Sequence, residues 1–272
     1  MPTLLRNNST LRSYAKTINK KLTDKDVPVT VTIVAAGSLC GILQLKNISK
    51  MKKLMIIAFI GLSQFVSAQV TKNLGDFSTI RVFDKINVTL VKSNESKIVI
   101  NGNRSADVEV VTKNDELKVR MKLEKLLKGE DIQATVYYKV INQVEASEGS
   151  FVGSADTFNS TAFEVNTKEG STIKLELDVQ KLKSKAASGG ILDLTGKAKN
   201  HDATLTSGGI LNGKSLTTEQ TTVVISAGGE ADVYATDFVD AKTRAGGTID
   251  VYGNPKQVNQ KTFAGGTINI RK

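Results

Sequence analysis

A column of acidic and amide side chains is the first feature of this sequence that could do chemistry. Each member lies between two apolar residues in one of several similar segments, as Asp250 lies between Ile249 and Val251. The column consists of Asp193, Asn212, Asp232, Asp250 and Asn269. If the segments stack as parallel strands, Asp232 and Asp250 come within about 5 Å of each other on an outer face. Their oxygens could then hold Ca²⁺. Known calcium-binding rolls repeat about every nine residues with another spacing, so the pattern favours hydrated carboxylates kept apart by neutral Asn.

Basic and aromatic side chains form a second outward stripe. The stripe comprises Lys185, Lys242, Arg244, Lys261 and Phe263, joined by Tyr234 and Tyr252, which point outward by alternation. A mixture of cations and aromatic rings on regular faces could bind an acidic glycan or a surface protein. The ligand-binding candidates are Lys242, Arg244, Tyr252, Lys261 and Phe263. The alternative is a solvated face on which Lys protects the edges of the sheet.

Catalytic chemistry has little support in the sequence. The single histidine, His201, stands in the polar stretch "KNHDAT" and is predicted to be a solvated turn residue, without a nucleophile or an orienting partner. A polysaccharide-acting enzyme is the alternative, because a glycosidase needs two carboxylates in a groove. The acidic column offers carboxylates, but no long insertion builds a groove around them. We therefore expect no catalytic residues and no cofactor.

The element that must position all these residues is a repeat marked by glycine. Gly or Gly-Gly recurs at Gly149, Gly170, Gly189, Gly208, Gly228, Gly246 and Gly265, at intervals of 21, 19, 19, 20, 18 and 19 residues. After each recurrence apolar residues alternate with polar ones, which is the signature of a strand with one buried face. One such segment cannot bury its apolar face alone, so successive copies must stack. The sequence predicts an all-β fold, a parallel β-solenoid (β-helix) with coils of about 19 residues.

The paired glycines are predicted to be structural corners. They are Gly189, Gly190, Gly208, Gly209, Gly228, Gly229, Gly246, Gly247, Gly265 and Gly266. Glycine suits a corner that needs a positive φ or a close approach between neighbouring backbones. A phosphate-binding loop would be followed by a helix, whereas a strand pattern follows each pair here.

The start of the chain reads as an export signal. "MKKLMIIAFIGLSQFVSA" (51–68) has a basic start, a short apolar run and small residues before Gln69, as a secretory signal peptide has. We interpret residues 1–50 as a misassigned or disordered extension, with translation starting at Met51. The alternative is a genuine extension in which Val29 to Leu43, including the only cysteine, Cys40, forms a hydrophobic hairpin.

Charge is concentrated in this leader. Residues 1–68 carry 10 Lys or Arg against 2 Asp or Glu, whereas residues 69–272 carry 27 against 25. A nearly neutral remainder argues against a nucleic-acid binder, which needs a clustered basic face. That remainder has no cysteine, so it can form neither a disulfide framework nor a cysteine-ligated metal site. We also expect no transmembrane helix in the mature chain.

The stretch before the repeats is predicted to be strand-rich, with capping strands at residues 69–148 and the glycine repeats at 149–272. "KLEKLLKGED" (122–131) breaks the alternation and is a loop or one helical turn. The opening "FSTIRVFDKINVTLVKS", the strand "NDELKVRM" and the closing "AGGTINIRK" resemble the putative auto-transporter adhesin head domain, the GIN-domain family of secreted Gram-negative proteins. The resemblance runs from about Phe77 to Lys272. It implies a β-solenoid with a surface or envelope role and supplies no catalytic residues.

Three functions follow as hypotheses. The first is an exported adhesin that is not an enzyme, located in the periplasm, on the outer surface or outside the cell, with a glycan or a surface protein as partner. The second is the polysaccharide-acting enzyme. The third is an envelope module that self-associates through the C-terminal coil, because "TINIRK" leaves an unpaired edge.

Overall fold

The computed structural model describes residues 69–271, together with two strands near the N-terminus. Those two strands, β1 (Val29–Ile33) and β2 (Gly41–Leu45), pair antiparallel as a hairpin. The predicted signal peptide (51–68) and Cys40 lie outside the described residues. The chain divides into two compact units, Met1–Val66 and Ser67–Lys272. None of the helices in the described ranges has the length and apolar character needed to cross a bilayer.

The second unit is built almost entirely of strands. They are β3 (Val70–Asn73), β4 (Thr79–Val82), β5 (Asn87–Lys92), β6 (Lys97–Asn101), β7 (Val108–Lys113), β8 (Glu116–Met121), β9 (Gln133–Tyr138), β10 (Gln143–Ala146), β11 (Phe151–Lys168), β12 (Thr172–Ala187), β13 (Ile191–Thr206), β14 (Ile210–Ser226), β15 (Glu230–Thr243), β16 (Thr248–Tyr252), β17 (Gln257–Thr262) and β18 (Thr267–Ile270). Two 3₁₀ turns, η2 (Ser105–Asp107) and η3 (Leu123–Lys125), lie between strands.

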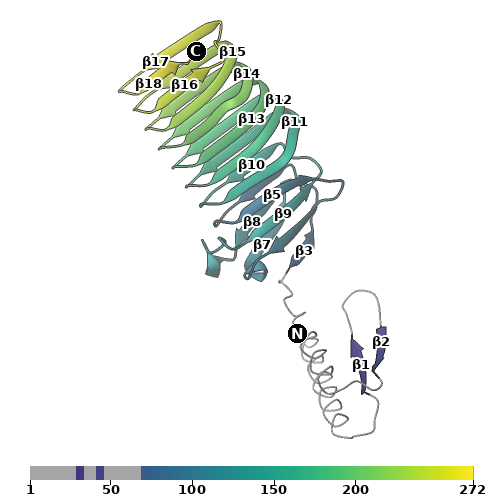
Figure 1. Cartoon of the computed structure of the whole chain (residues 1–272). Helices are drawn as coiled ribbons and strands as arrows, with labels where there is room; N and C mark the ends of the chain where they lie inside the picture. The colour runs from purple at the N-terminus through teal and green to yellow at the C-terminus, as the bar shows by residue number, and fades with distance from the viewer. Residues whose placement is uncertain (1–28, 34–40, 46–68, 272) are drawn as a thin grey trace. The chain divides into compact units, whose positions relative to one another are not determined.

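Successive coils stack as parallel strands, which confirms the predicted solenoid (Figure 1). β12 pairs with β13 in parallel from Thr172 opposite Ile191 to Ala187 opposite Thr206, an offset of 19 residues at both ends. The same parallel pairing continues from β11 through β15 and on to β17 and β18. Each central coil contains one long bent strand, such as β12 and β13 with 16 residues each.

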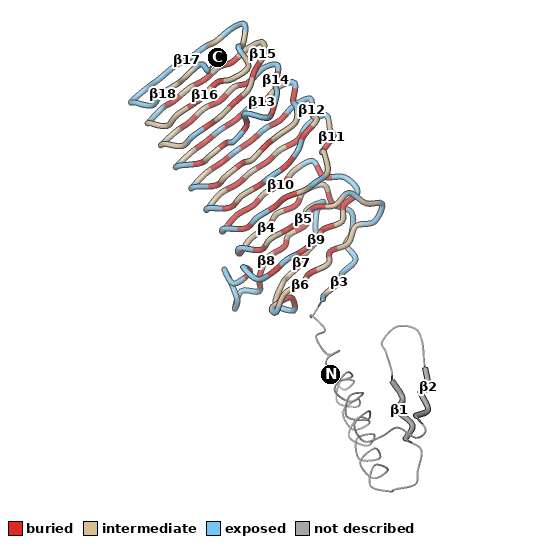
Figure 2. The backbone as a smooth tube through the Cα atoms, viewed as in Figure 1, coloured by how far each residue is buried: buried red, intermediate tan, exposed pale blue. Residues whose placement is uncertain are grey.

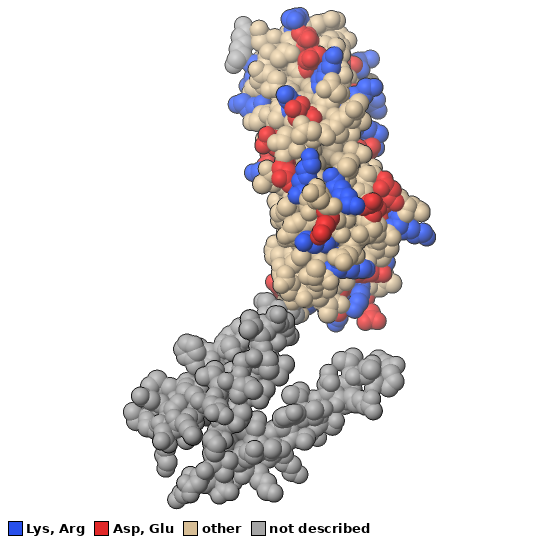
Figure 3. Space-filling model, turned by 90° about the vertical axis from the view of Figure 1, so that its right-hand side faces the viewer, with Lys and Arg blue, Asp and Glu red and all other residues tan. Residues whose placement is uncertain are grey.

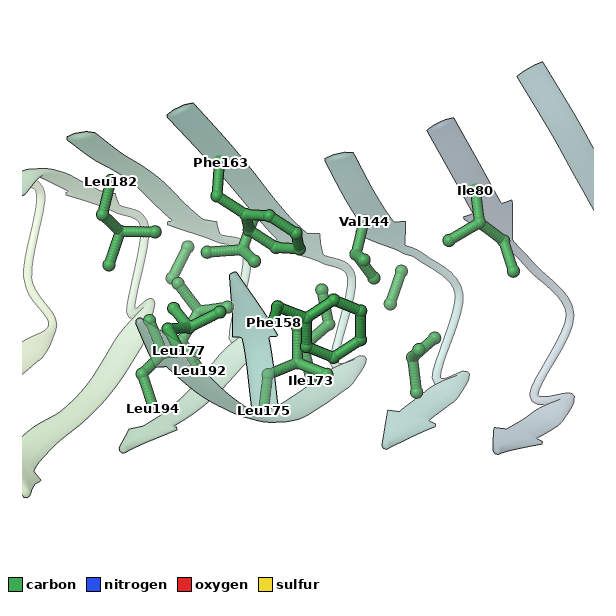
Figure 4. Close-up of a cluster of buried hydrophobic side chains, with 14 of the residues drawn as sticks. Ile80, Val144, Phe158, Phe163, Ile173, Leu175, Leu177, Leu182, Leu192 and Leu194 are labelled. Carbon is green, nitrogen blue, oxygen red and sulfur yellow. The ribbon is translucent and has the colours of Figure 1, made fainter. Parts of the chain in front are cut away.

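The bend in each long strand produces two facing rows of buried side chains. In β12 the buried positions alternate up to Val179, skip to Leu182 and alternate again, so the inward face changes phase at the bend. Buried and exposed positions alternate along each rung in Figure 2. Leu182 and Phe163 in one row face Leu177 and Leu192 in the other across the core (Figure 4). The strand halves before and after the glycine corner therefore present opposite outer faces.

The corners are tight turns that begin one residue before the first glycine. Ser188 and Gly189 have φ of 49° and 74°, and the Gly190 N–H donates to the Ala187 carbonyl over 2.9 Å. Consecutive corners lie directly upon one another, since the Gly189 N–H donates to the Ser207 carbonyl over 3.2 Å. The second glycine is required by space, because a Cβ on Gly190 would lie 2.7 Å from the Thr167 carbonyl carbon. The first glycine of the pair is therefore favoured by its positive φ, and the second by the lack of space for a side chain.

The N-terminal strands close the stack as predicted. β4 and β5 form a coil whose corner, Asp84–Lys85, has positive φ at both residues without any glycine. β8 and β9 form the coil before it in the stack. Beyond these, β7 pairs antiparallel with β8, and β6 pairs antiparallel with β9 and β3. The change from parallel to antiparallel pairing ends the solenoid on this side.

Candidate functional site

The acidic and amide column forms a continuous ladder on one outer face. Lys174 lies opposite Asp193, and the series continues through Asn212, Asp232 and Asp250 to Asn269. At its C-terminal end, Asp250 Oδ1 accepts hydrogen bonds from Asn269 Nδ2 over 2.7 Å and from Arg271 Nε over 3.0 Å. At its other end Lys174 Nζ lies 3.4 Å from an Asp193 carboxylate oxygen. Asp193 and Asp250 thus each have a donor on a neighbouring rung of the ladder.

Asp232 and Asp250, the two calcium candidates, occupy adjacent rungs of this ladder. Partial burial raises the pKa of Asp232, and the nearby Asp250 carboxylate raises it further, against the opposing effect of Lys214 and Arg271. Partial burial acts to raise the pKa of Asp250 as well, but the hydrogen bonds from Asn269 and Arg271 hold it below its usual value. No group of three or more His, Cys, Asp or Glu suited to a metal occurs among the described residues. The Asp250 carboxylate therefore has hydrogen-bond donors from Asn269 and Arg271.

Four of the five ligand-binding candidates lie together in one hollow, which we term the basic hollow. It is lined by Lys242, Thr243, Arg244, Lys261 and Phe263 and has a volume of about 370 Å³. Lys242 lies directly opposite Lys261 on the paired strands β15 and β17. Phe263 is 70% exposed, whereas Thr243 at the floor is buried. Stacking thus gathers cations and a free aromatic ring from two successive coils.

The charge of the basic hollow is only partly neutralised. Lys242 Nζ forms an ion pair of 2.6 Å with Asp240 Oδ2 on its own strand. Within the described part of the chain, Arg244 and Lys261 form no ion pair. Over the face seen in Figure 3, basic and acidic side chains occur in small mixed groups. Arg244 and Lys261 therefore give the basic hollow an excess of positive charge.

Tyr252 does not join the basic hollow, because it lies after the corner and so on the opposite face. It pairs in register with Tyr234 and, with Lys214, Asn254 and Arg271, lines a second hollow of about 390 Å³. Lys214 Nζ lies 4.5 Å from the centroid of the Tyr252 ring, a cation–π contact. A Cβ on Gly253, which also lines this hollow, would lie 2.7 Å from Tyr234 Cε1. Lys185 lies several rungs away, 3.7 Å from Glu164.

Sequence reasoning missed Lys214 and Arg271 as members of the second hollow. Lys214 stands where the register between β14 and β15 shifts, between Gly213 and Thr217. An irregularity of this kind removes a residue from the alternating pattern that identified the others. Arg271 could have been found from its position two residues after Asn269, on the same outward face of the strand.

The prediction for His201 was wrong. His201 is 2% exposed, and its Nε2 lies 2.7 Å from Ser184 Oγ in the row of buried side chains. The buried positions of β13 step by three residues from Ala198 to His201, so the change of phase at the bend turns the imidazole inward. Burial lowers its pKa from 6.5 to about 4. Ser184 is equally enclosed, at 1% exposure, so no substrate reaches this pair.

The comparisons agree with the coil architecture. The family model described as "Putative auto-transporter adhesin, head GIN domain" matches residues 76–255. The chain belongs to this GIN-domain family. The resemblance found in the sequence is thereby confirmed. No match was found among curated proteins.

Several solved structures share the GIN-domain fold. A putative adhesin from Bacteroides fragilis superposes with a TM-score of 0.70 at 18% identity, covering 76% of this chain and 98% of that one. A putative adhesin from Parabacteroides distasonis gives 0.58 at 17% identity, with 74% and 95% covered. A putative lipid binding protein from the same species gives 0.59 at 14% identity, with 76% and 98% covered. At such identities these likenesses show the fold alone.

Proposed function

We propose that this protein is an exported adhesin without enzymatic activity and that its basic hollow binds an anionic glycan. Membership of the GIN-domain family supports the adhesin class and a place at the cell surface or outside the cell. The observation that carries the ligand is the gathering of Lys242, Arg244 and Lys261 around the exposed ring of Phe263.

Each part of the basic hollow has a role that suits an acidic sugar. The Arg244 guanidinium can donate two parallel hydrogen bonds to a carboxylate or sulfate group. Lys261 and Lys242 add flexible ammonium donors for further anionic groups or hydroxyls. The exposed face of Phe263 offers apolar surface to the C–H face of a pyranose ring. Because the hollow is open across stacked rungs, it can also bind an internal segment of a polysaccharide and does not require a chain end.

The rigid coil supports this role. Backbone pairing fixes Lys242 and Lys261 opposite each other, so the points from which their side chains extend are set before a ligand arrives. Preorganised groups lose less conformational freedom on binding, which raises affinity for a repeating ligand. The corners beside the hollow contain only alanine and glycine, Ala245–Gly247 and Ala264–Gly266, and so present no large side chain that would cover it.

The test is binding of the unit of residues 67–272, which has its own core, to an array of acidic and neutral glycans. We expect acidic glycans to bind, and we expect Arg244→Glu with Lys261→Glu to reduce affinity at least about tenfold, or about 1.4 kcal/mol. Lys181→Glu with Lys199→Glu is the matched control, because both lysines are exposed and form no ion pair within the described residues. Equal losses in the two double variants, or binding to neutral glycans only, would refute the proposal.

A second candidate is self-association through the C-terminal coil. Ile270 in β18 is 41% exposed, and no strand of the described chain covers the outer edge of β17 or β18. A copy paired there would extend the sheet by strand addition. Sedimentation over a range of concentrations distinguishes this candidate, because it predicts oligomers that Ile270→Lys abolishes, whereas glycan binding by a monomer predicts none.

A further inference from the structure

Three large apolar side chains are exposed together in one short loop of the N-terminal cap. Leu123, Leu126 and Leu127 are 74%, 47% and 49% exposed. They belong to the segment Lys122–Lys128, which we term the leucine loop. Other large exposed apolar residues of the described chain, such as Val140 and Phe263, lie in separate segments. Single exposed apolar residues are normal, but a cluster of three indicates a surface that meets an apolar partner.

The leucine loop is held in its exposed position by hydrogen bonds to Asp84. This aspartate is 1% exposed, and its carboxylate accepts from the Met121 N–H over 3.0 Å and from the Leu127 N–H over 2.8 Å. The Asp84 carbonyl also accepts from the Gly129 N–H over 3.0 Å. Leu127 has φ of 59°, which is unusual for a leucine and needs such support. Ordered contacts therefore present the leucines outward.

Three lysines, Lys122, Lys125 and Lys128, and one acid, Glu124, stand among the leucines of the loop. Lys122 donates to the Ala106 carbonyl over 2.8 Å and lies 4.0 Å from Asp107. Lys125 and Lys128 are exposed and form no ion pair within residues 69–271. Arg104 adds a further cation, because its Nη1 donates to the Lys128 carbonyl over 3.2 Å. The three lysines and Arg104 outnumber the single carboxylate of the loop, Glu124, so apolar tips with a net positive charge beside them complement the boundary between acyl chains and anionic headgroups.

We propose that the leucine loop docks this protein on a lipid surface with anionic headgroups. The three leucines would enter the acyl boundary while the lysine ammonium groups remain at the level of the phosphates, as long basic side chains do at membrane interfaces. The loop connects β8 to β9 in the terminal coil, whereas the basic hollow lies at β15 and β17, near the other end of the stack. Docking through the loop therefore leaves the basic hollow away from the lipid.

The test measures flotation of the 67–272 unit with vesicles of phosphatidylcholine containing phosphatidylglycerol, and with vesicles of phosphatidylcholine alone. We expect binding to the anionic vesicles only. The variant Leu123→Ser, Leu126→Ser, Leu127→Asn should lower the partition coefficient at least about tenfold, or about 1.4 kcal/mol. Asn at position 127 keeps a residue that tolerates positive φ. Lys125→Glu with Lys128→Glu should abolish the preference for anionic lipid.

Two controls separate docking from a general loss of structure. Val140→Ser with Ile270→Ser removes exposed apolar side chains elsewhere and should leave flotation unchanged. The chain contains no tryptophan, so Leu126→Trp adds a unique probe whose emission should shift to the blue on anionic vesicles, while Val140→Trp should not shift. Flotation retained by the triple leucine variant, or no flotation of the unsubstituted unit, would overturn the proposal. Self-association that the triple variant abolishes, without vesicle binding, would assign the loop to a protein contact instead.

Discussion

The glycine pair Gly208–Gly209 allows the two constraints on a corner to be measured separately. Gly208 has φ of 77°, and a Cβ on it would meet nothing within 4 Å. Gly209 lacks the positive φ, but its Cβ would lie 2.6 Å from the Ala186 carbonyl carbon and closer still to the oxygen. We therefore expect Gly208→Ala to incur only a conformational penalty and Gly209→Ala a steric one.

The magnitudes follow from these environments. An L-residue in the left-handed region costs about 1–2 kcal/mol, so Gly208→Ala should lower Tm by roughly 2–8 °C in a unit of this size. At Gly209 the obstruction is backbone of the adjacent coil, which cannot rotate away. Separating the coils weakens pairings such as that of the Ile210 N–H with the Gly190 carbonyl, now 2.9 Å. Overpacking of this kind together with lost hydrogen bonds should cost more than about 3 kcal/mol.

Thermal unfolding followed by circular dichroism checks both values, and asparagine supplies the control. Asn tolerates positive φ, so Gly208→Asn should unfold at a higher temperature than Gly208→Ala. At position 209 Asn should be no better than Ala, since any Cβ makes the same contact. Equal effects at the two positions, or a rescue by Asn at position 209, would refute the division of roles within the pair.

Three further predictions concern the core and the cap. Lowering the pH from about 6.5 to about 4 should reduce the free energy of unfolding by roughly 3 kcal/mol, because His201 takes up a proton in the unfolded chain but not in the folded one, where its pKa is about 4. A pH series of denaturation curves measures this loss, and His201→Gln should remove it. The same pH dependence in both proteins would contradict the burial of a neutral His201. Ile249→Asp should expose the last coils to protease, because it buries an unpaired charge. Thr248→Asp, at the preceding position on the outer side of β16, should leave them protected. Equal protection of the two variants would show that Ile249 does not face the core. Asp84→Ala should weaken amide-exchange protection at Met121 and Leu127 while leaving β13 protected, and unchanged exchange at both amides would show that the carboxylate does not hold the leucine loop.

The stacking was predictable because its physical causes are periodic. Gly189, Gly208 and Gly228 recur nearly once per coil, and the alternation after each one assigns Leu192, Leu211 and Ala231 to the interior. The corner at Asp84–Lys85 escaped prediction because it reaches positive φ without glycine, at residues that tolerate this conformation less well than glycine does.

The sites were less predictable because they depend on which face a residue occupies. Lys242 and Lys261 could be grouped from the sequence, since both precede a corner at the same offset, and they lie on paired strands. Tyr252 follows a corner, and the turn of the chain at that corner places it on the opposite face. The bend within β13 turned His201 inward. A change of phase of this kind has no distinctive residue type, so alternation alone did not locate it.

The most direct test of the proposed function maps the ligand onto the protein. A titration of the ¹⁵N-labelled 67–272 unit with an acidic oligosaccharide should shift the amide resonances of Lys242, Arg244, Lys261 and Phe263 and leave those of Tyr234 and Tyr252 in place. Shifts centred on the tyrosine hollow, or on no part of the lateral faces, would contradict binding in the basic hollow.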